Sequence, residues 1–189
     1  MNAEDCIKKI KTDSKKPISE CDNSSSRAEF EHPGIYAIFL KEGRELYPSL
    51  VLAERRLLYI GIATNVYDRF FKQHFCKHNS SLSTFRRTIG AMLHLKAIPR
   101  LGKPEKTCYH YKFEEKEEKK LSSWMKDNLE WIYCKNDDDD LWKILKIERD
   151  IVIELKPPLN IKHSEHEFKE TVLKLRTECR QEADNNIHY

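Results

Sequence analysis

The sequence lacks a hydrophobic run long enough to cross a membrane. Its 189 residues are 34% charged, with a mean hydropathy of −0.73, and no apolar stretch approaches the roughly 18–20 residues that a membrane-spanning helix needs. The N-terminal sequence MNAEDCIKKIKTDSKK also lacks the apolar core of a secretory signal peptide. We therefore expect an intracellular, cytoplasmic protein with no membrane partner.

Closely spaced cysteine pairs are absent too. The six cysteines are scattered without a CxxC motif, and intracellular chains usually keep their thiols reduced, so we predict free thiols. His74 and His78, with Cys76 between them, have no second pair of ligands of the kind that zinc requires. The sequence also contains no internal repeat and no clear helix-turn-helix, so no separate target-reading module is evident.

The net charge of +3 conceals an uneven distribution. Residues 65–112 contain ten basic and two acidic residues, whereas residues 1–64 contain ten of each. Such clustering is typical of a surface that binds a polyanion, although a solvated basic face without a partner would look the same. Within this segment we predict contacts to nucleic-acid phosphates from Arg86, Arg87, Lys96, Arg100 and Lys103.

The hydrophobic pattern predicts two strands and a helix in the first half of the chain. Residues 1–31 are polar and aperiodic, and we expect a flexible or loosely docked tail. The runs at 34–40 and 57–63 have the length and composition of strands and read as a hairpin-like pair. Apolar residues with helical spacing follow over about 66–78.

The second half alternates between short strands and helices. We predict a helix within 80–100, a strand in YHYKF, a helix over 121–129 and a strand over 130–134. The acidic run 137–140 precedes a helix over 141–155, where acids favour the helix N-terminus. Together these elements indicate one domain over residues 32–163, followed by a C-terminal helix within 164–189.

Two charged residues stand among apolar neighbours. Glu148 lies four residues after Ile144 and three before Ile151, so it points along the apolar stripe of its helix. Arg69 is surrounded by aromatic residues on the earlier helix. A buried charge is normally paired, hydrogen-bonded or bound to a metal. These residues could pair with each other, or they could flank a phosphate with a divalent cation.

The ordered motifs resemble the GIY-YIG nuclease superfamily. The sequence contains GIY at 34–36 and YIG at 59–61, and Arg69 follows ten residues after Tyr59. The segment ERDIVIELKPPLN then places Glu148 twelve residues before Asn160. Four elements therefore agree in type and order over residues 34–160.

The resemblance implies an α+β fold with a three-stranded antiparallel sheet sandwiched between helices, and a role for each matched residue. Tyr36 and Tyr59 would position or deprotonate the attacking water, and Arg69 would contact the scissile phosphate. Glu148 would be the single protein ligand to Mg²⁺ or Mn²⁺. Asn160 would fix the geometry of the site, and Gly34 and Gly61 would serve as structural glycines that allow close packing.

Two features depart from the family pattern. The GIY and YIG triplets usually stand about ten residues apart, whereas 22 residues separate them here, so a longer loop must extend the hairpin. Several members also have a histidine four residues after the arginine, but here that position is Gln73 and the histidine is His74. One residue corresponds to about 100° around an α-helix, so His74 is the weakest candidate for a catalytic residue.

The leading hypothesis is a metal-dependent endonuclease that hydrolyses DNA phosphodiester bonds, duplex or branched. The alternative from another class is a non-catalytic nucleic-acid-binding module built on a decayed nuclease fold. A third possibility is an adaptor that binds another polyanion. Without a separate target-reading domain, specificity would come from the hairpin insert, the 80–130 region, the tails or a partner protein.

Overall fold

A four-stranded antiparallel sheet lies at the centre of the protein. The computed structural model describes residues 1–18, 27–76, 79–100, 111–136 and 140–186. The strand order is β1-β6-β2-β3. The strands are β1 Lys16–Pro17, β2 Gly34–Leu40, β3 Leu57–Ala63 and β6 Leu129–Lys135. This arrangement confirms the α+β class and the three predicted strands, and it adds β1 as a short edge strand.

Alternate residues of β2 face two separate hydrophobic cores. Side chains of a strand alternate between the two faces of its sheet, and every residue of GIYAIFL is buried. Ile35, Ala37 and Phe39 pack in one core, and Tyr36, Ile38 and Leu40 pack in the other. Tyr36, the tyrosine of the GIY motif, therefore belongs to the second core.

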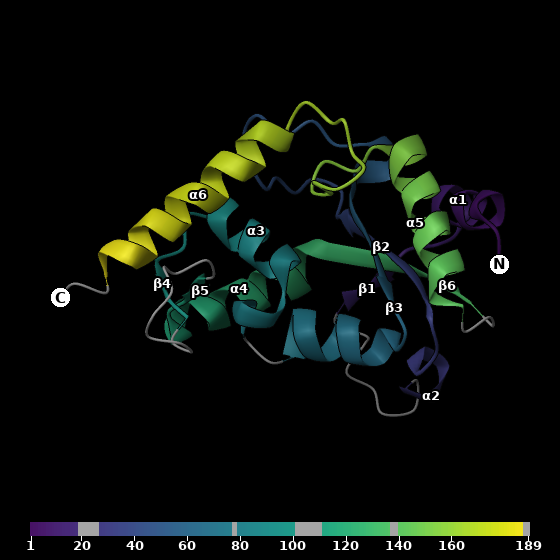
Figure 1. The fold of residues 1–189 in the computed structure, drawn as a ribbon, viewed down its shortest axis with the longest axis horizontal. Helices are drawn as coiled ribbons and strands as arrows, with labels where there is room; N and C mark the ends of the chain where they lie inside the picture. Colours follow the sequence, from purple (N-terminus) through teal and green to yellow (C-terminus); the bar gives the residue numbers. More distant parts are fainter. Residues whose placement is uncertain (19–26, 77–78, 101–110, 137–139, 187–189) are drawn as a thin grey trace.

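Helices cover both faces of the sheet (Figure 1). α1 Ala3–Thr12 and α5 Leu141–Leu155 pack on the face of Ile35. Four helices contribute to the core on the face of Tyr36: η4 Tyr67–Cys76, α3 Thr84–Met92, α4 Glu115–Asn128 and α6 Lys169–Asn185. α5 has the bounds expected from its periodicity, with Asp140 as its N-cap.

Helix α1 packs on the sheet, within the segment 1–31 for which the sequence predicted a flexible or loosely docked tail. Cys6 and Ile10, one helical turn apart on α1, are 1% and 3% exposed, and α1 packs against α5. Phe30 of the short helix α2 Arg27–Phe30 is buried as well. Ala3 and Ile7 pack against the same core, so a narrow apolar stripe docks a helix whose remaining positions are polar.

A two-stranded sheet and part of the β2–β3 connection pack against the C-terminal region. β4 Ala97–Pro99 and β5 Tyr111–Phe113 form a two-stranded sheet in contact with α6. The long connection between β2 and β3 includes the 3₁₀ turn η3 Glu54–Arg56. Within it, the Tyr47 ring packs 5.7 Å from the ring of Phe168, which precedes α6. The insert is therefore folded back on the C-terminal region.

η4 is a π-helix over its whole length. A π-helix has i→i+5 hydrogen bonds in place of the i→i+4 bonds of an α-helix, and such turns are frequent at functional sites. Residues five apart are therefore brought towards the same face. This local winding decides the position of His74 relative to Arg69.

Candidate active site

The two motif tyrosines lie side by side on neighbouring strands. Tyr36 of β2 pairs with Gly61 of β3, and Tyr59 stands two pairs further along, opposite Ile38. The two tyrosine rings are 6.3 Å apart between centroids. Tyr36 is 1% exposed, and the ring of Tyr59 packs 5.1 Å from Phe85 of α3. The hairpin register therefore places both phenol rings on one face.

Gly61 is required by the close approach of the Tyr36 ring. A Cβ atom at Gly61 would lie 2.3 Å from Cζ and 2.4 Å from the hydroxyl oxygen of Tyr36. A Cβ at Gly34 would instead meet the Tyr133 ring at 2.4 Å and the Cys134 carbonyl oxygen at 2.6 Å. Close packing therefore leaves no room for a side chain at either motif glycine.

We expect Gly61→Ala to lower the free energy of unfolding by about 1–3 kcal/mol, because the added methyl overpacks the contact with Tyr36. Combining it with Tyr36→Leu, which removes the clashing atoms, should recover most of this cost. Urea unfolding of the four proteins in this double-mutant cycle measures the coupling. Purely additive effects would contradict the assignment.

Asn160 lies behind the YIG motif and holds its backbone. Its Oδ1 accepts a hydrogen bond from the Ile60 N–H at 2.8 Å, and its Nδ2 donates to the Ile60 carbonyl at 2.8 Å. Leu159 N–H also donates to the Leu58 carbonyl at 3.0 Å. The segment after α5 thereby pairs with the outer edge of β3. Asn160 touches no other site residue in these contacts and positions Tyr59 through the strand.

Arg69 lies beside both tyrosines. Its guanidinium donates to the Gln73 side chain at 2.5 Å and to the Leu82 carbonyl at 3.2 Å. Burial raises the pKa of Tyr36 and of Tyr59 above the ordinary value of about 10. Arg69 lowers both pKa values and Glu148 raises both. These four residues therefore form one electrostatically coupled cluster.

Glu148 contributes a half-buried carboxylate to this cluster. It lies on α5 between Ile144 and Ile151, which are buried. Burial raises the pKa of Glu148, and only Lys162 acts in the opposite direction. Within the described part of the chain, no hydrogen bond or ion pair satisfies this carboxylate. The structural ion pair between Arg69 and Glu148 that the sequence left open is not formed.

The donor set suits a hydrated hard cation. Among the described residues there is no group of three or more His, Cys, Asp or Glu side chains that could hold a metal. A single unsatisfied carboxylate beside two phenol oxygens nevertheless fits Mg²⁺, which keeps most of its waters and is often bound by one or two carboxylates plus substrate phosphate. Glu148 would hold such an ion.

His74 reaches the site despite its displaced sequence position. Its Nε2 lies 2.8 Å from the Tyr36 hydroxyl and its Nδ1 lies 2.6 Å from Ser83 Oγ. Because η4 is a π-helix, His74 follows Arg69 by one i→i+5 turn. Burial, Arg69 and Arg86 lower the pKa of His74 well below its ordinary value, so the ring is neutral.

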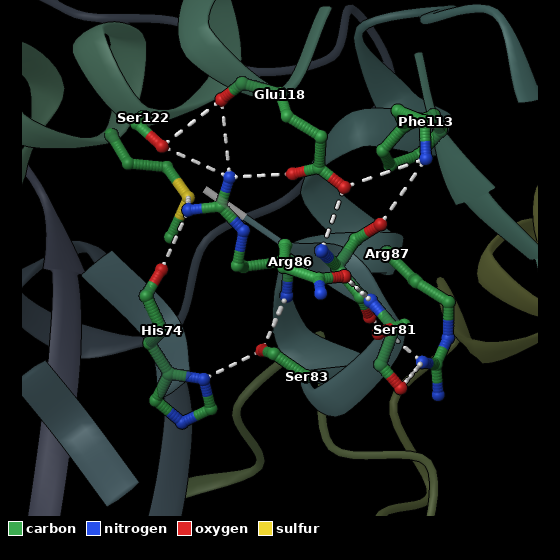
Figure 2. A network of polar contacts seen from close by, with 11 residues as sticks. His74, Ser81, Ser83, Arg86, Arg87, Phe113, Glu118 and Ser122 are labelled. Carbon is green, nitrogen blue, oxygen red and sulfur yellow. Dashed lines mark hydrogen bonds and ion pairs between the residues drawn. The ribbon is translucent and has the colours of Figure 1, made fainter. Parts of the chain in front are cut away.

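Arg86 does not contact solvent, contrary to its prediction as a phosphate-binding residue. Its side chain is 0% exposed and forms an ion pair with Glu118 Oε2 at 2.7 Å. It also donates to the His74 carbonyl at 2.7 Å and to Ser122 Oγ at 3.0 Å (Figure 2). Arg86 therefore ties η4, α3 and α4 together and supports His74 from behind.

The other predicted phosphate contacts differ in exposure. Arg87 is 7% exposed, and its guanidinium donates to main-chain carbonyls of the turn η5 Ser80–Leu82. Lys96 is exposed but paired with Glu114 at 2.7 Å. Arg100 is exposed and donates to the Ser81 carbonyl at 3.0 Å. Lys103 lies outside the described residues.

The comparisons agree with this geometry. The family model of the GIY-YIG catalytic domain matches residues 34–182, and the chain belongs to this family. No curated protein and no solved structure matches the chain significantly. The family assignment indicates a nuclease, a hydrolase with a nucleic-acid substrate, and such nucleases generally use divalent metals. No helix among the described residues is long and apolar enough to span a membrane.

Sequence reasoning missed two parts of this site. The helix predicted within 80–100 does not reveal that Ser83, at the start of α3, contacts a distant histidine. Glu118 lies in the run EEKEEKK, whose alternating charges are typical of a solvated helix face. Only its spacing to Leu121 and Ser122, one turn away on the buried face of α4, could have suggested its burial.

Proposed function

We propose that the protein is a divalent-metal-dependent endonuclease that hydrolyses phosphodiester bonds of DNA. The single observation that carries this proposal is the pairing of Tyr36 and Tyr59 on β2 and β3 with Arg69 and Glu148 near enough to shift the pKa of both, while the Glu148 carboxylate has no partner among the described residues. The reaction adds water across a P–O bond and leaves a phosphate monoester and a hydroxyl group.

Each residue has a role that follows from its chemistry. Arg69 presents a guanidinium that can hold a phosphate oxygen and stabilise the negative charge that develops during attack. Glu148 would hold the metal, which supplies Lewis acidity to the phosphate and lowers the pKa of bound water. The raised pKa values keep both tyrosines protonated in the free protein at neutral pH. Their hydroxyls therefore orient the attacking water by hydrogen bonds.

His74 acts in this proposal as a hydrogen-bond donor to Tyr36. The Ser83 hydroxyl is 0% exposed and already accepts the Arg86 N–H at 3.0 Å. Among the described residues, the one acceptor within reach of its own proton is His74 Nδ1. That bond fixes the proton of the neutral ring on Nε2, which then donates to the Tyr36 oxygen.

This tautomer decides which group can take the proton of Tyr36. Because Nε2 already carries a hydrogen, His74 does not serve as a base for the phenol. A donor to the Tyr36 oxygen instead stabilises a phenolate when one forms. The Tyr36 proton is then directed away from His74, towards the side where Arg69 and the substrate lie.

The tautomer has a direct spectroscopic test. In protein labelled with ¹⁵N-histidine, the His74 ring should show a protonated-type ¹⁵N shift at Nε2 and an unprotonated-type shift at Nδ1, with the signals assigned by His74→Gln. Ser83→Ala, which removes the donor to Nδ1, should shift the tautomer balance, whereas Ser83→Thr should preserve it. The opposite pattern in the wild type would make His74 an acceptor from Tyr36 and would overturn this role.

Nicking of supercoiled plasmid tests the proposed function itself. We expect cleavage with Mg²⁺ or Mn²⁺ and none in EDTA. Linear, branched and single-stranded DNA should be tested in parallel, because the target structure is unknown. A folded protein that binds these DNAs but cleaves none would favour the non-catalytic binding module instead.

A further inference from the structure

Two neighbouring arginines of α3 are buried, but only one has a counter-charge. Arg86 is paired with the Glu118 carboxylate. Among the described residues, Arg87 donates only to uncharged acceptors: the Ser80 carbonyl at 2.8 Å, the Ser81 carbonyl at 3.1 Å and Thr84 Oγ1 at 3.1 Å. Figure 2 shows their guanidinium groups directed to opposite sides of the helix. Leaving a buried cation without an anion is costly, so Arg87 needs another explanation.

Three more arginines lie close to Arg87. After burial, the groups that lower the pKa of Arg87 are Arg176, Arg100 and Arg180. Arg176 and Arg180 stand one turn apart on α6, which packs on α3. We call Arg87, Arg100, Arg176 and Arg180 the arginine cluster. Within the described part of the chain, none of its members forms an ion pair.

The cluster also contains an unsatisfied donor. Arg176 Nε is buried and has no hydrogen-bond partner in the part of the chain that the structure describes, and the pKa of Arg176 is lowered by burial and by Arg180. Four like charges with a free buried donor are unfavourable unless an anion joins them. Guanidinium groups match the geometry of a phosphate group particularly well.

The arginine cluster and the proposed catalytic arginine share the turn η5. Arg69 donates to the Leu82 carbonyl, and both Arg87 and Arg100 donate to the Ser81 carbonyl. Adjacent carbonyls of one short turn therefore connect the catalytic site to the cluster. A DNA strand bound at Arg69 has further phosphates available for a second contact in this direction.

We infer that the arginine cluster binds a backbone phosphate of the substrate DNA, separate from the phosphate that is cleaved. This inference rests on the proposed nuclease function. It adds Arg176 and Arg180, which lie outside the basic segment 65–112, to the DNA-binding surface, and it removes Arg86. The cluster contacts only the backbone, so it contributes affinity and register without reading sequence.

The test compares two charge-matched double variants. Arg176→Gln/Arg180→Gln removes two positive charges from the cluster, and Lys8→Gln/Lys9→Gln removes two from exposed positions of α1 on the opposite face of the sheet. Binding of a fluorescent duplex is measured by anisotropy in EDTA over a range of NaCl concentrations. Plasmid nicking with Mg²⁺ and the melting temperature are measured on the same samples.

We expect the slope of log K against log [NaCl] to become shallower by up to about 0.9 in the α6 variant, the change for one lost phosphate contact. The α1 variant should keep the wild-type slope. In nicking, KM should rise while kcat changes little, because the lost contact binds the substrate and the transition state equally. The melting temperature of the α6 variant should not fall, because repulsion between cations is relieved.

Failure of the cluster assignment and failure of the nuclease proposal would give different results. Equal slopes for both variants, with wild-type nicking intact, would overturn the cluster assignment and leave the nuclease proposal standing. This result is also expected if the true occupant were an acidic protein. A folded wild type that neither binds nor cleaves DNA would overturn both proposals.

Discussion

Replacing Glu148 with glutamine is expected to reduce DNA cleavage by roughly 1,000-fold or more. The variant keeps the size of the side chain but removes the charge that would hold the metal. Losing several kcal/mol of charge stabilisation at the phosphate has this effect, since each 1.36 kcal/mol corresponds to a factor of ten in rate. The readout is the rate of plasmid nicking at saturating Mg²⁺.

The Glu148→Gln variant should be as stable as the wild type or more stable. Burial raises the pKa of Glu148, so the native state disfavours its charged form relative to the unfolded chain. The charge therefore costs stability at neutral pH, and removing it should leave the melting temperature unchanged or higher. A lower melting temperature together with lost activity would instead indicate a structural role for the carboxylate.

Asp150→Asn provides the matched control. Asp150 is exposed on the same helix, so its neutralisation changes the net charge of the protein by the same amount. We expect wild-type nicking from this variant. Comparable losses in the two variants would assign the effect to the overall charge of α5 and would remove Glu148 as the metal ligand.

Motifs with strong periodicity were predictable from the sequence. Strands β2 and β3 and helix α5 coincide with the predicted segments because short apolar runs of strand length and a continuous apolar stripe at helical spacing leave few other solutions. The elements that carry the GIY and YIG motifs and Glu148 therefore have the predicted bounds. The family assignment that they suggested is confirmed by the family model. The role of each residue stays a prediction.

Long-range partners were not predictable in the same way. Arg86 and Arg87 are adjacent in the sequence and look equivalent, yet one faces Glu118 and the other faces the arginine cluster. The π-helical winding of η4 moved His74 into contact with Tyr36, and no residue pattern in YDRFFKQHFC marks that winding. Both outcomes depend on what packs against the helix, which a local pattern does not contain.

The largest effect on stability is expected from Glu118→Gln. This variant leaves the Arg86 guanidinium buried without a counter-charge, and breaking one partner of such a pair costs about 3–5 kcal/mol. For a chain of this size that corresponds to a fall in melting temperature of about 6–20 °C. Glu115→Gln is the control, because the Glu115–Lys119 pair on the same helix is solvent-exposed, and exposed ion pairs contribute little to stability.

Replacing both partners separates the cost of an unpaired buried charge from the cost of altered packing. Arg86→Met/Glu118→Leu fills the site with apolar groups and leaves no isolated charge, so it should be more stable than Glu118→Gln alone. It still loses the hydrogen bond from Arg86 to the His74 carbonyl. If the network positions His74 against Tyr36, the double variant will be folded but slower in nicking. A double variant as unstable as Glu118→Gln would show that packing, and not the unpaired charge, dominates the loss of stability.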